Sequence, residues 1–438
     1  FQAIIETNRG CPFLCTFCVE GEKYYTRVSK TQNRKIHEEL VYIAEHMASL
    51  RETGKARSDL RIADSNFGMY KEDLEICHTI AEMQEKHGYP EYVSVATGKN
   101  RKEMVLEAAK IINGALHLSG SVQSLDKSVL ANIKRDNISE QAIMDMALAS
   151  SEIGANNYSE IILGLPGDTR EGHLKSIQKM VEMDFNTICL YQLMLLPGTD
   201  LATRKSVNQW KIKSQFRVLP RCFGHFDIFG KEINAAEIEE ICTENNSLTF
   251  EDYLDCRRMH LIGNLFHNDG VFKEVLRLLG SLGLSKFVWL EKINHFRNNK
   301  RFNNLVKEFL NETTNELWEQ EESLRQFIRE RKNIKKYIDG SLGANLIFKY
   351  KSLSMVKYSS ELAEVAKATL SDYLSEVGAK SDTEKIGIEL IEYARLRMTD
   401  IFENLEKVHE GTFNFDVAQY SQDVKPNTVE AYKLPKPI

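Results

Sequence analysis

The sequence predicts an α/β fold in which six strand–helix repeats form a partial barrel of parallel strands, followed by a mainly helical region. Two observations support this. Within the first two hundred residues, short apolar runs alternate with longer segments whose apolar residues recur at helical spacing. Such alternation favours a parallel sheet with right-handed crossovers, and six repeats are fewer than the eight of a closed barrel. Beyond residue 248, the apolar residues recur mainly at helical spacing.

The expected elements alternate along the first part of the chain. We expect strands at 2–6, 59–63, 92–96, 115–121, 158–163 and 187–193. We expect helices at 33–52, 70–87, 102–112, 126–153 and 169–184. Parallel strands place their carboxyl ends at one edge of the sheet, where α/β proteins bind ligands. A functional site is therefore expected at the strand ends.

Three parts are expected in the whole chain. Residues 1–205 form the barrel core, 206–247 a β-hairpin that caps the barrel mouth, and 248–438 a mainly helical region. The hairpin is expected over 216–233 with its turn at Gly230, and charged helices are expected to about residue 410. The last stretch, from Phe413, is expected to be a strand followed by a loose tail.

Composition narrows the classes of protein. The 438 residues are 42% hydrophobic, which suffices for a large core, and the net charge of -6 argues against a general affinity for nucleic acid or anionic membranes. We find no apolar run of eighteen residues and no signal peptide, so we expect a cytoplasmic protein. Five of the eight cysteines are scattered, which favours reduced thiols over a disulfide framework. These are Cys77, Cys189, Cys222, Cys242 and Cys256.

The other three cysteines, Cys11, Cys15 and Cys18, follow the first expected strand in the run Arg-Gly-Cys-Pro-Phe-Leu-Cys-Thr-Phe-Cys. A 4Fe-4S cluster normally has four thiolate ligands, so three leave one iron open to a small molecule. A zinc site would need a fourth ligand, and His37 or Cys77 would have to supply it from a distance. We expect an open-site cluster, with a zinc site or a plain electron carrier as alternatives.

This cysteine spacing resembles that of the radical S-adenosylmethionine (SAM) superfamily, in which the open iron binds the amino and carboxylate groups of SAM. Phe17 is similar to the superfamily's aromatic residue whose backbone faces the adenine. After the second strand, the resemblance places Asp64, Ser65 and Asn66 at the Gly-Gly-Glu element that holds the methionyl amino group, although the letters differ. The three residues are candidates by position only.

Two later strand ends are also similar to SAM-binding elements. The run Ser-Val-Gln-Ser resembles a Gly-Val-Gln-Ser pattern, which implies that Gln123 reaches the ribose or carboxylate of SAM. The run Ile-Ile-Leu-Gly-Leu-Pro-Gly-Asp-Thr resembles the adenine motif, which implies contacts from Ile162 and Gly164. Glycine there lets the backbone approach a ligand closely.

Several of these matches have a purely structural alternative. Asp168 with Glu171 fits an ordinary capping box for the next helix, and Asp64 fits a cap for the helix near residue 70. Phe17 fits a core aromatic. The sixth strand is followed by Leu-Pro-Gly-Thr at 196–199, which is also similar to an ending found in the superfamily. The order of these elements on strands one, two, four, five and six favours the functional interpretation.

The resemblance implies a 4Fe-4S cluster that cleaves SAM to a 5′-deoxyadenosyl radical, an electron donor such as flavodoxin or ferredoxin, and a small-molecule substrate. Within the superfamily, the chain looks most like the group with a cobalamin-binding domain ahead of the barrel, whose members commonly methylate unactivated carbon or phosphorus, or rearrange carbon skeletons. Because the chain starts at Phe1, we expect about a hundred or more upstream residues to fold as that domain. The alternatives are cobalamin-free oxidation, epimerisation or sulfur insertion, and a non-catalytic metal-binding protein.

Overall fold

The structure is a computed structural model, and it describes residues 1–152, 156–398, 408–423 and 427–436. The chain divides into two compact units. Unit 1 contains Phe1–Lys213 and Cys242–Thr249, and unit 2 contains Ser214–Ile241 and Phe250–Ile438. Within the described ranges, we find no helix with the length and apolar character needed to cross a membrane.

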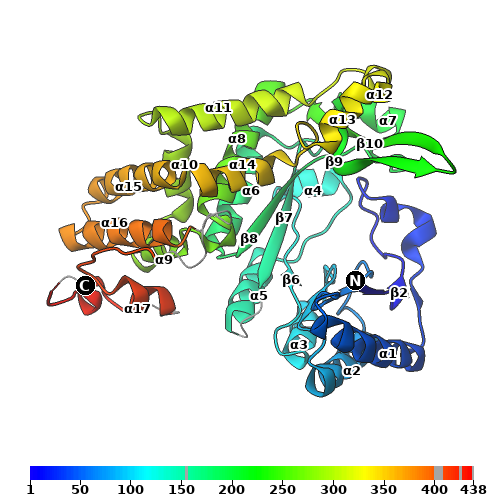
Figure 1. The fold of residues 1–438 in the computed structure, drawn as a ribbon, viewed down its shortest axis with the longest axis horizontal. Coiled ribbons are helices and arrows are strands. Elements are labelled where there is room, and N and C mark those ends of the chain that lie inside the picture. The colour runs from blue at the N-terminus through cyan, green and yellow to red at the C-terminus, as the bar shows by residue number, and fades with distance from the viewer. Residues whose placement is uncertain (153–155, 399–407, 424–426, 437–438) are drawn as a thin grey trace. The chain divides into compact units, whose positions relative to one another are not determined.

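Unit 1 is built on six parallel strands that follow one another in sequence order (Figure 1). The first three strands form one sheet and the last three a second sheet. An isolated parallel bridge from Val93 to Leu116 links them, and the described strands form no closed barrel. The strands are β1 (Ala3–Ile5), β4 (Asp59–Ile62), β5 (Tyr92–Ser94), β6 (Leu118–Ser119), β7 (Asn157–Leu163) and β8 (Thr187–Gln192). The α/β fold with an open, partial barrel is thus confirmed.

Helices connect these strands, and a small hairpin flanks the cysteine loop. The helices are α1 (Asn33–Glu52), α2 (Lys71–His87), α3 (Lys102–Ile111), α4 (Lys127–Asn132), α5 (Glu140–Glu152), α6 (Arg170–Glu182) and α7 (Arg204–Trp210). The cysteine loop contains η1 (Val19–Gly21) and η2 (Lys23–Thr26), and it lies between β2 (Asn8–Arg9) and β3 (Ser29–Lys30). The apolar side chains on one face of α1 are buried in the same cluster as Leu60 and Val93, which anchors this helix on the first sheet; they are Ile36, Leu40, Ala44 and Met47.

The single helix expected over 126–153 is wrong, because the structure has two helices there, α4 and α5; residue 153 lies outside the described residues. Asp126 caps α4 by accepting hydrogen bonds from the backbone N–H groups of Ser128 (2.7 Å) and Val129 (3.1 Å). After α4 the chain turns at Lys134, whose φ of 52° lies in the left-handed region. The break places Arg135 in the interior, 4% exposed.

The two proposed helix caps are also wrong. Thr169, not Asp168, caps α6, since its hydroxyl accepts from the Gly172 N–H at 3.0 Å. At the start of α2, Asp73 accepts from the N–H groups of Gly68 (2.8 Å) and Tyr70 (3.0 Å), so Asp64 is available for other contacts.

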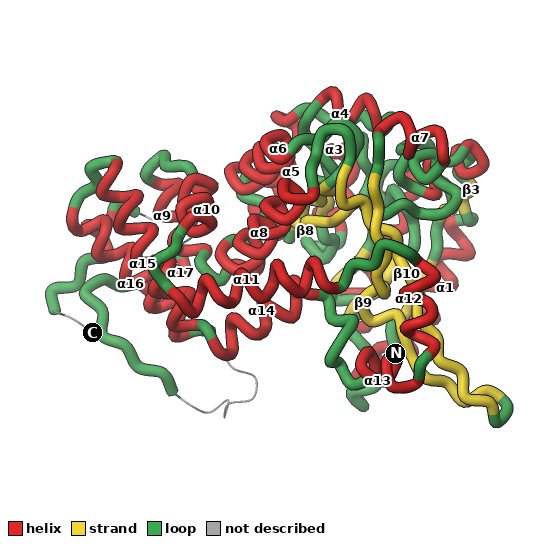
Figure 2. Tube along the Cα trace, turned by 90° about the horizontal axis from the view of Figure 1, so that it is seen from above, coloured by secondary structure: helices red, strands yellow, loops and turns green. Residues whose placement is uncertain are grey.

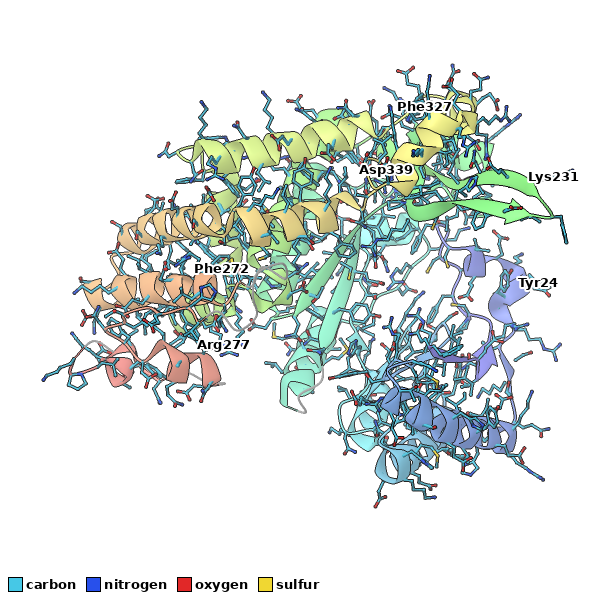
Figure 3. The ribbon with its side chains drawn as sticks, viewed as in Figure 1. Tyr24, Lys231, Phe272, Arg277, Phe327 and Asp339 are labelled. Carbon is cyan, nitrogen blue, oxygen red and sulfur yellow. The ribbon has the colours of Figure 1, made fainter. Side chains whose placement is uncertain are left out.

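Unit 2 begins with a long antiparallel hairpin of β9 (Lys213–Ile228) and β10 (Lys231–Glu244), seen as a two-stranded ribbon in Figure 2. It is longer than the 216–233 expected, and its turn is formed by Phe229 and Gly230 with positive φ. Lys231 marks its tip in Figure 3. The capping role of this hairpin remains a prediction.

The rest of unit 2 is helical. Its helices are α8 (Phe250–Phe266), α9 (Lys273–Ser281), α10 (Lys286–His295), α11 (Lys300–Asn315), α12 (Glu321–Arg329), α13 (Arg331–Ile338), α14 (Leu346–Lys357), α15 (Ser359–Glu376), α16 (Ser381–Leu396) and α17 (Val417–Gln422), with η3 (Asn268–Gly270) and η4 (Val429–Tyr432). Phe272 lies among these helices (Figure 3), where its ring stacks on Phe266 at 5.3 Å and meets Trp289 edge-on at 6.2 Å. The strand expected from Phe413 is wrong, because Asp416 instead caps the helix α17.

Candidate active site

The cysteine loop leaves β1 at the strand ends of unit 1. Cys11 and Cys15 are buried, Cys18 is half-buried, and none of them is in a disulfide. Backbone hydrogen bonds fix the loop, because Cys11 N–H donates to Tyr25 O at 2.9 Å and Cys18 N–H donates to Cys15 O at 3.1 Å. At Gly21 a Cβ would lie 2.1 Å from the Cys15 carbonyl oxygen, so only glycine fits there. Burial raises the pKa of the Cys18 thiol.

Polar side chains from three other loops surround the cysteine sulfurs. Lys99 Nζ, in the loop after β5, lies 3.7 Å from Cys15 Sγ. Asn66 Nδ2, after β4, donates to Cys11 Sγ at 3.2 Å. Burial lowers the pKa of Arg135, while the charge of the Cys15 sulfur and a hydrogen bond with it act in the opposite direction. Two cationic side chains and an amide thus face two of the three cysteines.

A second lysine lies beside this group. Lys102 Nζ donates to the carbonyl oxygens of Gly98 (2.8 Å) and Ser119 (2.9 Å), which follow β5 and end β6. Burial, reinforced by the charge of Arg135, lowers the pKa of Lys102 to about 7. Lys102 therefore links the loop after β5 to the end of β6.

The acidic candidate after β4 holds the start of the cysteine loop. The Asp64 carboxylate accepts hydrogen bonds from the N–H groups of Thr7 (2.8 Å) and Asn8 (3.2 Å), from the Thr7 hydroxyl, and from Asn8 Nδ2 at 2.5 Å. Burial raises its pKa against the effect of these bonds. Its oxygens therefore already have partners, and Ser65 beside it is half-buried.

Three buried polar atoms near the strand ends have no hydrogen-bond partner among the described residues. They are Thr16 Oγ1 in the cysteine loop, Asn66 Oδ1 and Gln123 Oε1. Gln123 has a φ of 64° and pairs with β7 through its backbone, while its Nε2 lies 3.3 Å from Glu160 Oε2. A buried polar atom without a partner costs about 1 to 3 kcal/mol, so atoms of this kind indicate a place for a polar ligand.

The structure brings the remaining candidates together. Phe17 and Ile162 pack, partly buried, against one apolar cluster that includes Leu165 and Cys242. Gly164 follows β7 with a φ of 91°, a conformation that suits glycine, and a Cβ there would lie 3.5 Å from Cys242. These three residues thus share one side of the strand ends.

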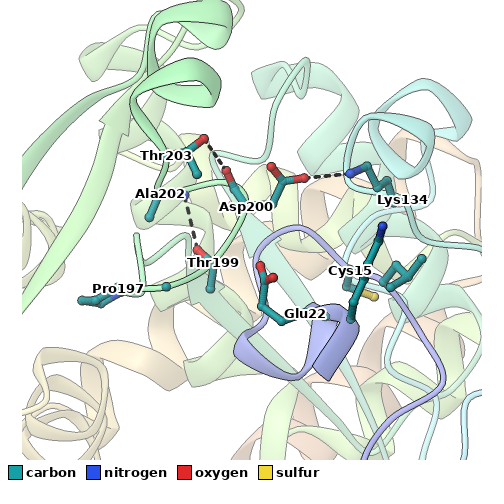
Figure 4. Close-up of a pocket in the computed structure, with 12 residues that line it drawn as sticks. Cys15, Glu22, Lys134, Pro197, Thr199, Asp200, Ala202 and Thr203 are labelled. Carbon is teal, nitrogen blue, oxygen red and sulfur yellow. Dashed lines mark hydrogen bonds and ion pairs between the residues drawn. The ribbon is translucent and has the colours of Figure 1, made fainter. Parts of the chain in front are cut away.

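A cavity of about 630 Å³ opens beside the cysteine loop (Figure 4). Its lining includes Cys15 and Glu22 from the loop and Thr199 from the segment after β8. Lys134 Nζ pairs with Asp200 Oδ2 at 2.7 Å on its wall. Its volume is in the range of small-molecule pockets.

The donor set fits an iron–sulfur cluster better than a single ion. Among the described residues, no group of three or more His, Cys, Asp or Glu side chains is arranged to hold a single metal ion. A cubane held by three thiolates is larger and carries net negative charge, which suits Lys99 and Arg135 beside Cys15. The chemistry of the side chains therefore fits an open-site 4Fe-4S cluster.

Sequence reasoning missed the two cations. Lys99 belongs to the run Lys-Asn-Arg-Lys in the loop after β5, and a basic run in a loop after a strand is a signal that could have identified it. Arg135 carries no such signal, because it lies where one continuous helix was expected.

Comparison with known proteins agrees with this arrangement. The family described as the radical SAM superfamily matches residues 5–180, so this part of the chain is similar to a radical SAM domain. The domain contains the cysteine loop, the Asn66 and Gln123 strand ends and the Gly164 loop, and its superfamily consists of enzymes that use a 4Fe-4S cluster and SAM.

Two curated relatives are named as methyltransferases. The cobalamin-dependent radical SAM methyltransferase TokK of Streptomyces tokunonensis is 30% identical over 259 residues, covering 58% of this chain and 36% of the relative. The 2-(S-pantetheinyl)-carbapenam-3-carboxylate methyltransferase of Streptantibioticus cattleyicolor is 28% identical over 58% of this chain and 36% of its own length. The chain thus spans about a third of the length of these relatives.

A solved structure is also similar to this chain. The radical SAM methyltransferase TsrM of Kitasatospora setae, with tryptophan and a SAM analogue bound, aligns over 48% of this chain and 38% of its own, with 16% identity and a TM-score of 0.39.

Proposed function

We propose that this chain is the catalytic part of a radical SAM enzyme that reductively cleaves SAM and uses the resulting 5′-deoxyadenosyl radical for cobalamin-assisted methyl transfer to a small molecule. The observation that carries the proposal is the loop that holds three free cysteines, Cys11, Cys15 and Cys18, with the cations Lys99 and Arg135 beside Cys15. Two relatives with methyltransferase names support the methyl-transfer step.

The three cysteines would hold the cluster, and their neighbours would support it. Lys99 and Arg135 place positive charge beside Cys15, which offsets the negative charge of a thiolate-bound cubane. When bound, the cluster supplies one electron to SAM, which gives methionine and the 5′-deoxyadenosyl radical. We infer that an electron donor such as flavodoxin or ferredoxin provides that electron.

The chain's own residues would bind and orient SAM. Gln123 Oε1 and Asn66 Oδ1 are buried acceptors that have no partner in the described part of the chain, and they suit the hydroxyl and amino groups of SAM. Phe17 and Ile162 offer apolar surface for the adenine, and Gly164 allows its backbone to come close. In this proposal Asp64 acts indirectly, because its carboxylate already binds Thr7 and Asn8.

The test is an anaerobic assay of the whole natural protein with SAM, reductant and cobalamin, analysed by mass spectrometry. Methyl transfer predicts both 5′-deoxyadenosine and S-adenosylhomocysteine, because one SAM provides the radical and a second the methyl group. 5′-Deoxyadenosine alone would favour cobalamin-free hydrogen abstraction, the second candidate. Bound zinc without either product would overturn the proposal.

A further inference from the structure

A short segment that follows the matched domain by about sixty residues in the sequence contacts the loop after β7. This return segment, Cys242–Thr249, begins with the last residues of β10 and belongs to unit 1, whereas the rest of β10 belongs to unit 2. Its backbone is anchored there, because Cys242 N–H donates to Leu193 O and Asn246 N–H donates to Trp210 O, each at 2.9 Å. It lies well beyond residue 180, where the radical SAM match ends.

Side chains of the return segment bind the carbonyl oxygens of the loop. Asn245 Nδ2 donates to Gly164 O at 3.0 Å and lies 3.3 Å from Leu165 O. Ser247 Oγ donates to Asp168 O at 2.7 Å. Asn245 Oδ1 accepts from the Ser247 N–H at 2.9 Å, which fixes the orientation of the Asn245 amide.

The hydrogen bonds from Asn245 restrain the loop at Gly164, a residue whose backbone is intrinsically flexible. Gly164 has no side chain to pack, and its φ of 91° is one of many conformations that glycine adopts. Without Asn245, two carbonyl oxygens lose a donor, and the backbone of Gly164 gains freedom that ligand binding must remove again. Binding energy is greatest when the protein is already in the bound conformation.

We propose that Asn245 is a positioning residue for SAM: through the carbonyl oxygens of Gly164 and Leu165 it holds the loop after β7 in the form that accepts the adenosine moiety. Asn245 does not touch the ligand in this proposal. The inference rests on the proposed function, in which Gly164 lies against SAM.

The decisive variant is Asn245→Asp, which keeps the shape of the side chain but turns the donor toward Gly164 and Leu165 into an acceptor. Its matched control is Asn246→Asp, the same change at an exposed neighbour whose side chain has no hydrogen bond among the described residues. SAM binding is followed by the change that it causes in the electron paramagnetic resonance (EPR) spectrum of the reduced cluster. We expect the dissociation constant of SAM to rise about tenfold or more in Asn245→Asp and to stay unchanged in Asn246→Asp.

Two further measurements separate the possible failures. Iron content must equal that of the wild type in both variants, because Asn245 does not contact the cysteines. Hydrogen exchange without SAM should become faster over residues 164–168 in Asn245→Asp only. If Asn245→Asp does not fold, Ser247→Ala, which removes the bond to Asp168 O, must raise the dissociation constant in the same direction.

Wild-type protein that binds neither iron nor SAM would contradict the proposed function itself. Wild-type protein that binds SAM, together with an Asn245→Asp variant of equal affinity and equal hydrogen exchange, would overturn this inference alone.

Discussion

Both units bury charged side chains, but they satisfy them differently. In unit 2, Arg217 bonds to Glu239 and Glu316, each at 2.5 Å, and all three side chains are largely buried. In unit 1, Lys99 and Arg135 face cysteine sulfurs, and polar atoms of Asn66, Gln123 and Thr16 near the same strand ends have no partner among the residues that the structure describes. An ion network in which every charge has a partner is typical of a structural role. Polar groups that lack partners and converge at one edge of a sheet indicate a ligand site.

Unit 2 also has buried atoms without a partner in the described part of the chain, and they sharpen this contrast. Arg257 Nε, Asn294 Oδ1 and Tyr420 OH are examples, on α8, α10 and α17 respectively. They come from separate helices and lie next to no group of cysteines. Convergence, rather than a missing partner alone, distinguishes the candidate site.

The largest effect is expected from the cysteine loop. Cys15→Ala should abolish most iron binding and all SAM cleavage, because two thiolates cannot hold a cubane with an open site. The control is Cys222→Ala, which changes an exposed cysteine of unit 2. Iron analysis and 5′-deoxyadenosine formation measure the result, and a Cys15→Ala protein with wild-type iron would disprove the assignment.

The next effect concerns the ion network of unit 2. Arg217→Met leaves Glu239 and Glu316 buried without their cation, so the free energy of unfolding should fall by about 3 to 5 kcal/mol. Arg331→Met removes an exposed pair with Glu232 and should change it by less than about 1 kcal/mol. Chemical denaturation measures both, and equal losses would show that the network has no special role.

A smaller effect is expected at the SAM site. Gln123→Ala should weaken SAM binding by about 1 to 3 kcal/mol, the value of the hydrogen bonds lost, while iron content is unchanged. Gln141→Ala on the exposed side of α5 serves as the control. Isothermal calorimetry or EPR titration would give the affinity, and wild-type affinity in Gln123→Ala would refute the role given to its side chain.

The cation at Cys15 should tune the reduction potential. Lys99→Met removes a positive charge near the cluster, which destabilises the reduced, more negative form and lowers the potential by on the order of 50 mV. Lys23→Met removes a charge from the exposed part of the same loop and should shift it less. A redox titration followed by EPR would decide, and a higher potential in Lys99→Met would contradict the charge argument.

The last expected effect is a pH dependence of stability that arises at the start of α2. Burial raises the pKa of Asp73 from 3.8 to about 6, so the folded protein binds this proton more tightly than the unfolded chain. Its contribution to stability is full below pH 4 and is lost as the pH rises through about 6, a loss of about 1 to 3 kcal/mol. In Asp73→Asn this part of the pH dependence should vanish. An unchanged slope of unfolding free energy between pH 4 and pH 7 would show that another group titrates there.

The sequence by itself determined the order of six strands and most of the helices between them, because hydrophobic periodicity and turn residues act over a few neighbouring positions. It also determined the candidate cysteine trio, since three cysteines within eight residues can be recognised without tertiary information. The long-range contacts needed the fold. Arg135 reaches Cys15 because the chain turns at Lys134 between two helices, and Asn245 reaches Gly164 because the chain returns after a hairpin. The residues around Arg135 and Asn245 carry no local sequence pattern that indicates these contacts. Only the path of the backbone in three dimensions therefore decided which charged and amide side chains surround the site.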